Sequence, residues 1–310
     1  MAPTTTAALV LVLFSLGCSP PGVPGPTAAP PTARPTVVDG FASPESVLGV
    51  GARRFVSNIG EKLDPFAKDG DGFISELDED GTIIELRAFP RSGSLLHAPK
   101  GMAAVRNTLY VADVDRVVGF DLSTHVQVFE AVVESPALLN DLDAESDVAI
   151  LVTDTVKGTV SRLQLADGAF SPVARDIPGA NGVAIDRASR IAWIVGLGTA
   201  LSGGQEAGAV FAVPLDGGAV RQLKAARGLF DGVAMLPSGE LLVSDWVAID
   251  KPTPGRLATY RATGERGSTL ALPSEVHGPA DFYYDAARNE LWIPQTLDNR
   301  VMVVRVARAP

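Results

Sequence analysis

Six copies of one phrase supply the residues whose types and spacing could do chemistry. The clearest copies span residues 98–114, 179–196, 230–246 and 278–296, and two weaker copies span 43–59 and 138–155. Each contains a turn, a register position, a small residue, an apolar strand, a second turn and another apolar strand. The residues at the register position are Glu45, Lys100, Asn140, Asn181, Asp231 and Ala280. Two carboxylates and two amide carbonyls in this set are hard oxygen ligands, which suit Ca²⁺.

The spacing of the copies indicates the architecture that positions these residues. By subtraction of their numbers, the register residues lie 55, 40, 41, 50 and 49 residues apart, and further strand pairs follow, as at 158–177 and 208–225. A period of about 40 to 50 residues with four short strands is typical of a β-propeller blade. The sixth copy lacks sequence for a fourth strand, which residues 35–41 can supply. We expect an all-β fold, a six-bladed β-propeller over 37–310, closed by an N-terminal strand.

In a propeller, the first residue of each innermost strand lies at the mouth of the central channel, so the register residues form a ring there. Asn and Asp before Gly are common in turns, and polar residues can simply solvate strand ends, so one such residue alone is weak evidence. Four oxygen-bearing residues in one register favour a metal site. Its predicted ligands are Glu45, Asn140, Asn181 and Asp231, with water at the remaining positions.

Other charged residues accompany the predicted metal ligands. Lys100 enters the ring from the second blade, where it could clamp a developing oxyanion, lower the affinity for a metal or replace the metal through a salt bridge. His277 begins the sixth blade and His97 precedes Lys100, so either is a candidate general base, or a histidine that hydrogen-bonds a loop. The predicted catalytic set is Asp231, Glu45, Lys100 and His277.

Asp281 follows the register residue of the sixth blade, so we expect it to point into the channel behind the ring. Three tryptophans, Trp193, Trp246 and Trp292, fall on second strands of blades. We expect these three to pack in the core.

The N-terminal segment predicts export. Residues 1–18 contain an apolar run over 7–16 that is too short to span a bilayer and suits a secretory signal. The segment ends in S-L-G-C at Cys18, the single cysteine, which resembles a bacterial lipobox and predicts lipidation, although an ordinary signal peptide with a stray cysteine is the alternative. Residues 19–36 form a Pro/Ala-rich linker. The sequence predicts a lipoprotein on the periplasmic or cell-surface side of a membrane, attached only through this anchor.

Composition and missing motifs exclude several function classes. The net charge is −10 and the chain has no long run of Lys or Arg, which argues against nucleic-acid binding. The sequence has no G-x-S-x-G, no P-loop, no dinucleotide-binding G-x-G-x-x-G and no Cys/His cluster, so serine hydrolysis and nucleotide binding are not expected.

Residues 67–78, AKDGDGFISELD, resemble an EF-hand loop. Ala67 has no ligand atom at the first position, Asp78 replaces the usual Glu at the twelfth, and the flanks lack helical periodicity. We instead expect FISEL and TIIEL to be the two outer strands of the first blade, joined by a DEDG turn.

The chain resembles the senescence marker protein, gluconolactonase and luciferin-regenerating enzyme family of six-bladed propellers, relatives of the paraoxonases and strictosidine synthase. The resemblance covers about residues 40–306. Members of that family hold one divalent metal, usually calcium, through a Glu in the opening blade and the Asn, Asn and Asp of N-D, N-G and D-G motifs. These match Glu45, Asn140, Asn181 and Asp231 in order. The resemblance implies hydrolysis of a lactone or ester, with the metal polarising the carbonyl and Asp231 helping to activate water.

This chain departs from the sugar lactonases of that family at Leu138, where they usually carry an Arg that binds substrate hydroxyls. A polar sugar lactone is therefore a less suitable substrate. Three long links between second and third strands, at 58–72, 196–208 and 245–255, are expected to wall the site.

Three hypotheses remain open at this point. The first is an exported calcium-dependent hydrolase that acts on a small-molecule lactone or ester. The second is a non-catalytic propeller that binds a ligand or protein and uses the ion structurally. The third is a metal-free enzyme similar to strictosidine synthase, with Glu45 as acid and base.

Overall fold

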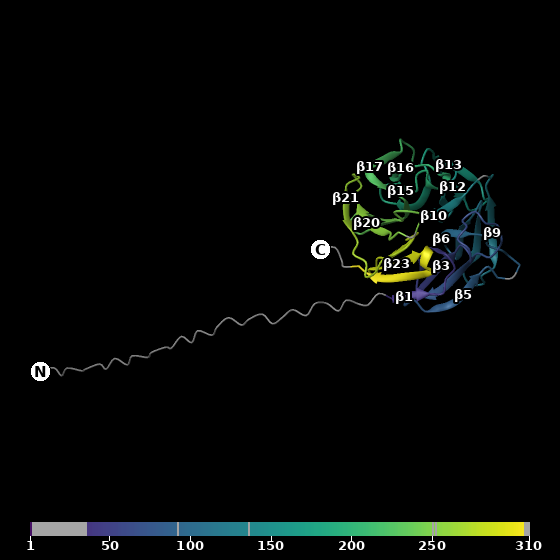
Figure 1. The fold of residues 1–310 in the computed structure, drawn as a ribbon, viewed down its shortest axis with the longest axis horizontal. Coiled ribbons are helices and arrows are strands. Elements are labelled where there is room, and N and C mark those ends of the chain that lie inside the picture. The colour runs from purple at the N-terminus through teal and green to yellow at the C-terminus, as the bar shows by residue number, and fades with distance from the viewer. Residues whose placement is uncertain (2–35, 92, 136, 250, 252, 307–310) are drawn as a thin grey trace. The chain divides into compact units, whose positions relative to one another are not determined.

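Six antiparallel sheets of four strands are arranged in a ring about a common axis (Figure 1). The computed structural model of the chain describes residue 1 and residues 36–306, apart from residues 92, 136, 250 and 252. The predicted signal peptide, Cys18 and almost all of the predicted linker lie outside the described residues. The prediction of an all-β, six-bladed propeller is confirmed.

Each of the first three blades is built from four consecutive strands. Their bounds are β2 (Pro44–Val50), β3 (Arg53–Asn58), β4 (Phe73–Asp78) and β5 (Ile83–Phe89) in blade one; β6 (Pro99–Val105), β7 (Thr108–Asp113), β8 (Arg116–Asp121) and β9 (Gln127–Val132) in blade two; and β10 (Leu139–Ser146), β11 (Ala149–Asp154), β12 (Thr159–Gln164) and β13 (Phe170–Ala174) in blade three. FISEL lies in β4, and β5 begins at the second residue of TIIEL, so the strand interpretation of the EF-hand-like segment is confirmed.

The last three blades follow the same plan, with one exchange in the sixth. Their bounds are β14 (Ala180–Asp186), β15 (Ile191–Gly196), β16 (Gly208–Pro214) and β17 (Arg221–Gly228) in blade four; β18 (Phe230–Met235), β19 (Leu241–Asp245), β20 (Arg256–Tyr260) and β21 (Arg266–Thr269) in blade five; and β22 (Tyr283–Asp285), β23 (Glu290–Gln295), β24 (Arg300–Arg305) and β1 (Thr36–Asp39) in blade six. Two short 3₁₀ helices, η1 (Ala200–Ser202) and η2 (Thr296–Asp298), follow second strands.

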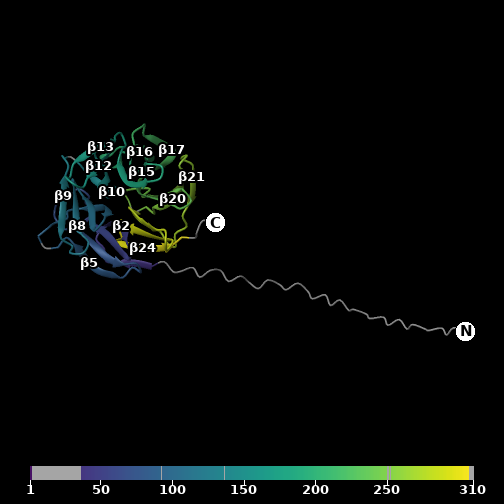
Figure 2. The ribbon, with the colours of Figure 1, turned by 180° about the vertical axis from the view of Figure 1, so that it is seen from behind.

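The N-terminal strand closes the ring as predicted. β1 pairs antiparallel with β24, with Thr36 opposite Val303 and Asp39 opposite Arg300, and is the outermost strand of blade six. Figure 2, seen from behind, shows β2 and β24 where the first and last blades meet. Because this strand comes from the opposite end of the propeller sequence, it joins the two ends and covers the outer edge of β24.

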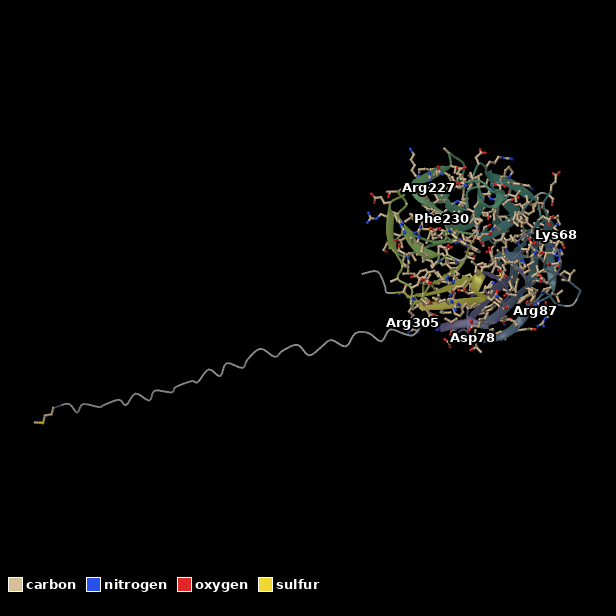
Figure 3. All side chains as sticks on the ribbon, viewed as in Figure 1. Lys68, Asp78, Arg87, Arg227, Phe230 and Arg305 are labelled. Atoms are coloured by element: carbon tan, nitrogen blue, oxygen red, sulfur yellow. The ribbon has the colours of Figure 1, made fainter. Side chains whose placement is uncertain are left out.

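Hydrophobic clusters lie between neighbouring blades. One such cluster joins Trp193 of blade four to Phe230 and Tyr260 of blade five, whose ring centroids are 5.7 Å apart. Figure 3 shows Phe230 within the ring, whereas Arg305 lies at its periphery. The second strands β11, β19 and β23 are buried along their whole length, whereas the outer strands β5 and β9 mainly alternate partly buried and exposed residues.

Acidic side chains at the ends of second strands fix the approach to the inner strands. Asp113 Oδ1 accepts hydrogen bonds from the backbone N–H groups of His97 and Ala98. Asp154 and Asp245 make the equivalent bonds in blades three and five, to the residue just before the inner strand. These bonds hold the chain directly before the register positions, so they help to set the geometry of the ring.

Candidate functional site

The register residues lie where the inner strands leave the regular ladder. In β18, Phe230 pairs with Asp245 and Val233 pairs with Val243, so Asp231 and Gly232 are not paired in the ladder. Equivalent shifts occur in the inner strands β2, β6, β10 and β14. A bulge of this kind re-aims a side chain out of the sheet. The repeat therefore places one such side chain per blade at the same level of the ring.

Three of the bulges leave a backbone N–H group without a partner in the ladder. Hydroxyl groups on the second strands accept hydrogen bonds from these N–H groups. Ser244 Oγ accepts from Gly232 N at 2.7 Å, and Thr153 Oγ1 accepts from Asp141 N at 2.9 Å. Ser57 has the same role in blade one. The irregular backbone is thereby satisfied, because an unpaired buried N–H group is costly.

The glycines of the N-G and D-G motifs permit close approach of adjacent blades. A Cβ on Gly182 would lie 2.2 Å from the backbone oxygen of Asp231, and a Cβ on Gly232 would lie 2.8 Å from the Cα of Asp281. A larger residue would push the blades apart at the level of the ring. The motifs are therefore needed to bring the register residues together.

Five of the six register residues line one cavity of about 240 Å³. They are Glu45, Lys100, Asn140, Asn181 and Asp231. Ala280, whose side chain is a single methyl group, does not line this cavity. Its segment bonds on both sides: Ala280 N donates to Pro294 O of its own blade, and Asp281 N donates to Glu45 O of blade one. The regular inner strand of blade six starts at Tyr283, after an isolated pairing of Pro279 with Gln295.

Four of these residues present buried oxygens without a hydrogen-bond partner. They are Glu45 Oε2, Asn140 Oδ1, Asn181 Oδ1 and Asp231 Oδ1. Each comes from a different blade, and all four residues line the same cavity. Buried acceptors are normally paired with a donor, an ordered water or an ion, so four unpaired ones facing one space mark this cavity as a candidate cation site. Two carboxylates and two amide oxygens fit a divalent cation that prefers oxygen ligands.

A hydrogen-bond relay sets the orientation of the Asn140 amide. Thr155 Oγ1 donates to the Ala180 carbonyl at 2.7 Å, so it can only accept from Asn140, whose Nδ2 lies 3.1 Å away. The nitrogen therefore faces Thr155 and Oδ1 faces the cavity. A flipped amide would place an acceptor against a hydroxyl whose proton is already used.

Burial and mutual repulsion raise the pKa values of the carboxyl groups of the site. Burial raises the pKa of Glu45 well above its usual value, and Asp231 and Asp281 add to this rise. Burial likewise raises the pKa of Asp231 to about 8, with Asp281 adding to the effect. Carboxyl groups in such surroundings hold a proton unless a cation replaces it.

Lys100 is held by backbone carbonyls. Its side chain is fully buried, and Nζ donates to Ala98 O at 2.7 Å and to Pro65 O at 3.1 Å. Burial lowers the pKa of Lys100 to about 8, against the opposing attraction of Glu45 and Asp113. Among the described residues, no carboxylate lies within 4.0 Å of Nζ in a salt bridge. Lys100 thus ties the loop of blade one to the ring.

The two candidate histidines do not line the cavity. His277 Nδ1 lies 3.1 Å from Asp298 Oδ2, and its backbone oxygen accepts from Leu297 N. His97 donates its backbone N–H to Asp113. The structure therefore does not bring His277 together with the other three residues of the predicted catalytic set.

The three long links wall the cavity, as predicted. Leu63 and Pro65 come from the link of blade one, Leu197 and Leu201 from that of blade four, and Trp246 from that of blade five. Ile249 follows Trp246 in the same wall, and Ile59, Leu138 and Thr296 complete the lining.

The prediction for Trp246 was wrong, whereas Trp193 and Trp292 are buried in clusters between blades, as predicted. Trp246 follows the last residue of β19, so it lies past the strand end and lines the cavity. That position relative to Asp245, the strand-ending acidic residue, is the sequence signal that would have identified it.

A second group of acidic side chains lies one residue beyond the ring. Asp141 and Asp281 belong to the lining of another cavity, of about 450 Å³. Asp281 accepts a hydrogen bond from Ser46 Oγ at 2.5 Å, and burial raises its pKa to about 7. The position expected for Asp281, behind the ring, is confirmed.

Comparisons with known proteins do not name a family. No family model matches the chain, and a search of curated proteins finds no significant match. None of the helices in the described residues has the length and apolar character needed to cross a membrane. What is shown is a six-bladed β-propeller with a polar ring beneath an apolar-walled cavity.

Proposed function

We propose that the protein is an exported calcium-dependent hydrolase of lactones or esters, similar to the gluconolactonase-like family. The four unpartnered oxygens that face one cavity carry this proposal. Glu45, Asn140, Asn181 and Asp231 would hold the ion. When bound, the ion supplies a Lewis acid that polarises the carbonyl of the substrate.

The residues of the chain account for the remaining steps. Asp231 would accept a proton from the attacking water, whose oxygen forms a bond to the carbonyl carbon. The bond between that carbon and the ester oxygen breaks, and the ester oxygen takes a proton to become a hydroxyl. The apolar walls would exclude bulk water, which strengthens the electrostatic interactions inside the cavity. Lys100, itself a residue of the ring, adds positive charge there.

Calorimetry and a substrate panel test this proposal. Calcium is titrated into chelator-treated protein, and aliphatic and aromatic lactones and esters are assayed with and without chelator. We expect hydrolysis that is lost on chelation and in Asp231→Ala. The control is Asp216→Asn, which removes an exposed carboxylate far from the ring and should change neither property.

Other outcomes would select the other hypotheses. Calcium binding without turnover across the panel would favour a binding propeller with a structural ion. Turnover that is indifferent to the chelator would favour a metal-free enzyme with Glu45 as acid and base.

The predicted lipid anchor requires a separate measurement. Mass spectrometry of the mature protein should find a lipidated N-terminal Cys18 and membrane-fraction localisation that is lost in Cys18→Ala. An unmodified N-terminus would leave an ordinary signal peptide as the explanation of residues 1–18.

A further inference from the structure

The wall of the cavity differs in chemistry from its floor. All charged residues of the lining belong to the ring, and the wall above it is apolar apart from Thr296. The apolar lining residues are Ile59, Leu63, Pro65, Leu138, Leu197, Leu201, Trp246 and Ile249. A substrate with several hydroxyl groups would lose hydrogen bonds to water there without replacing them, whereas an apolar body would be removed from water.

Three different loops place large apolar side chains at this cavity while leaving them partly exposed. Leu63, Leu201 and Ile249 are 38%, 41% and 39% exposed, and each comes from a different long link. Exposed apolar side chains that surround one opening favour binding of an apolar ligand, because the ligand removes them from water. The opening thus continues the apolar wall outward from the ring.

One unpartnered donor lies within this apolar wall. Trp246 Nε1 is buried and has no hydrogen-bond partner. Trp246 and Asp231 line the same cavity, and Asp231 Oδ1 is likewise buried without a partner. The donor therefore shares a cavity with the predicted reacting group and is available to an acceptor on a ligand.

We infer that the cavity takes an uncharged ester or lactone with an apolar alkyl or aryl body, and that the Trp246 N–H donates to an oxygen of its ester group. This inference rests on the proposed function. Trp246 acts as a positioning and specificity residue, since it holds the substrate oxygen beside Asp231 while its ring packs against the apolar body.

A series of lactones with one ring size and increasing alkyl length tests the substrate class. We expect kcat/KM to rise about fourfold for each added methylene until the cavity is full. Polyhydroxylated lactones of the same ring size should be hydrolysed at least a hundredfold less efficiently. Leu201→Ser should flatten the dependence on chain length, whereas Val128→Ser, an exposed residue of β9, should leave it unchanged. A flat series, or preference for the hydroxylated lactones, would overturn the inference.

Paired tryptophan variants test the donor. Trp246→Phe keeps an aromatic ring and removes the N–H group, and it should raise KM about fivefold at every chain length. Trp193→Phe is the matched control, because the Trp193 indole N–H is also unpartnered but lies in a core cluster. Equal KM changes in both variants, or none in Trp246→Phe, would exclude the positioning role.

Binding of stable lactam analogues separates failure of this inference from failure of the proposed function. Their affinities, measured by calorimetry, should follow the same dependence on alkyl length and the same loss in Trp246→Phe. If the lactams behave in this way and no ester or lactone is hydrolysed, the proposed hydrolase is wrong while the apolar ligand class stands. If esters are hydrolysed without any dependence on alkyl length, the proposed hydrolase stands while the apolar ligand class is wrong.

Discussion

Two layers of the channel hold polar side chains that are adjacent in sequence but differ in how they are satisfied. In the ring, Asn140 Oδ1 has no partner. One residue further on, Asp141 accepts from Val183 N and from Leu142 N, both at 2.7 Å. Asp281 in the same layer accepts from a serine hydroxyl. The protein therefore supplies donors for the second layer and leaves four oxygens of the ring without one, where the proposed function places a cation.

The largest effect is expected from a change in the second layer. Asp141→Ala removes the acceptor of two buried backbone N–H groups, each of which costs about 1–3 kcal/mol when unpaired. We expect the free energy of unfolding of the metal-free protein to fall by roughly 4 kcal/mol, as measured by urea denaturation. A loss below about 1 kcal/mol would show that the second layer is not held by these bonds.

A substitution in the ring should lower the affinity for calcium without lowering the stability of the metal-free protein. Asp231→Asn removes a buried carboxyl group whose pKa is raised by burial and whose Oδ1 has no hydrogen-bond partner, so the metal-free variant should be at least as stable as the parent. Its affinity for calcium should fall about a hundredfold or more, equivalent to roughly 3 kcal/mol, by calorimetry. Destabilisation of the metal-free variant with unchanged calcium affinity would reverse the comparison.

Stability should depend on pH and calcium together. Burial raises the pKa values of Glu45 and Asp231, so the folded state binds protons more tightly than the unfolded state. The free energy of unfolding of the metal-free protein should therefore fall as pH rises from about 4 to 8. Calcium at one fixed concentration, a hundred times its Kd at pH 8, should add about 2.7 kcal/mol at pH 8 and less at pH 5, where competing protons raise the Kd. Thermal unfolding at both pH values, with calcium and with chelator, measures this difference; an equal gain would contradict it.

The smallest effect concerns the orientation of one amide. Thr155→Val removes the hydroxyl that fixes Asn140 and should weaken calcium binding about tenfold, or roughly 1.4 kcal/mol. Thr296→Val is the control, because the Thr296 hydroxyl donates to the Pro44 carbonyl rather than to a ring amide. Similar losses of calcium affinity in both variants would show that the relay through Thr155 has no special part.

The repeated pattern was sufficient for the fold and for the membership of the ring. Each inner strand starts at the same level of the channel, so residues at the same position of successive repeats meet at one cavity. These residues are Glu45, Lys100, Asn140, Asn181 and Asp231. Ala280 keeps the same register, since its carbonyl accepts from Ser244 Oγ as the Asn181 carbonyl accepts from Thr153 Oγ1, but its methyl group does not line the cavity. His277 was proposed from nearness in sequence, which does not determine the direction of a loop.

The sequence by itself determined the number of blades, the closing strand and the residue types of the ring, because these follow from a local repeat and its phase. Only the tertiary structure decided which oxygens lack partners, which way Asn140 faces and that Trp246 joins the wall. The physical reason is that hydrogen-bond satisfaction depends on donors from other strands, such as Val183 N for Asp141, 42 residues away. Wall composition likewise depends on which loops meet over the ring.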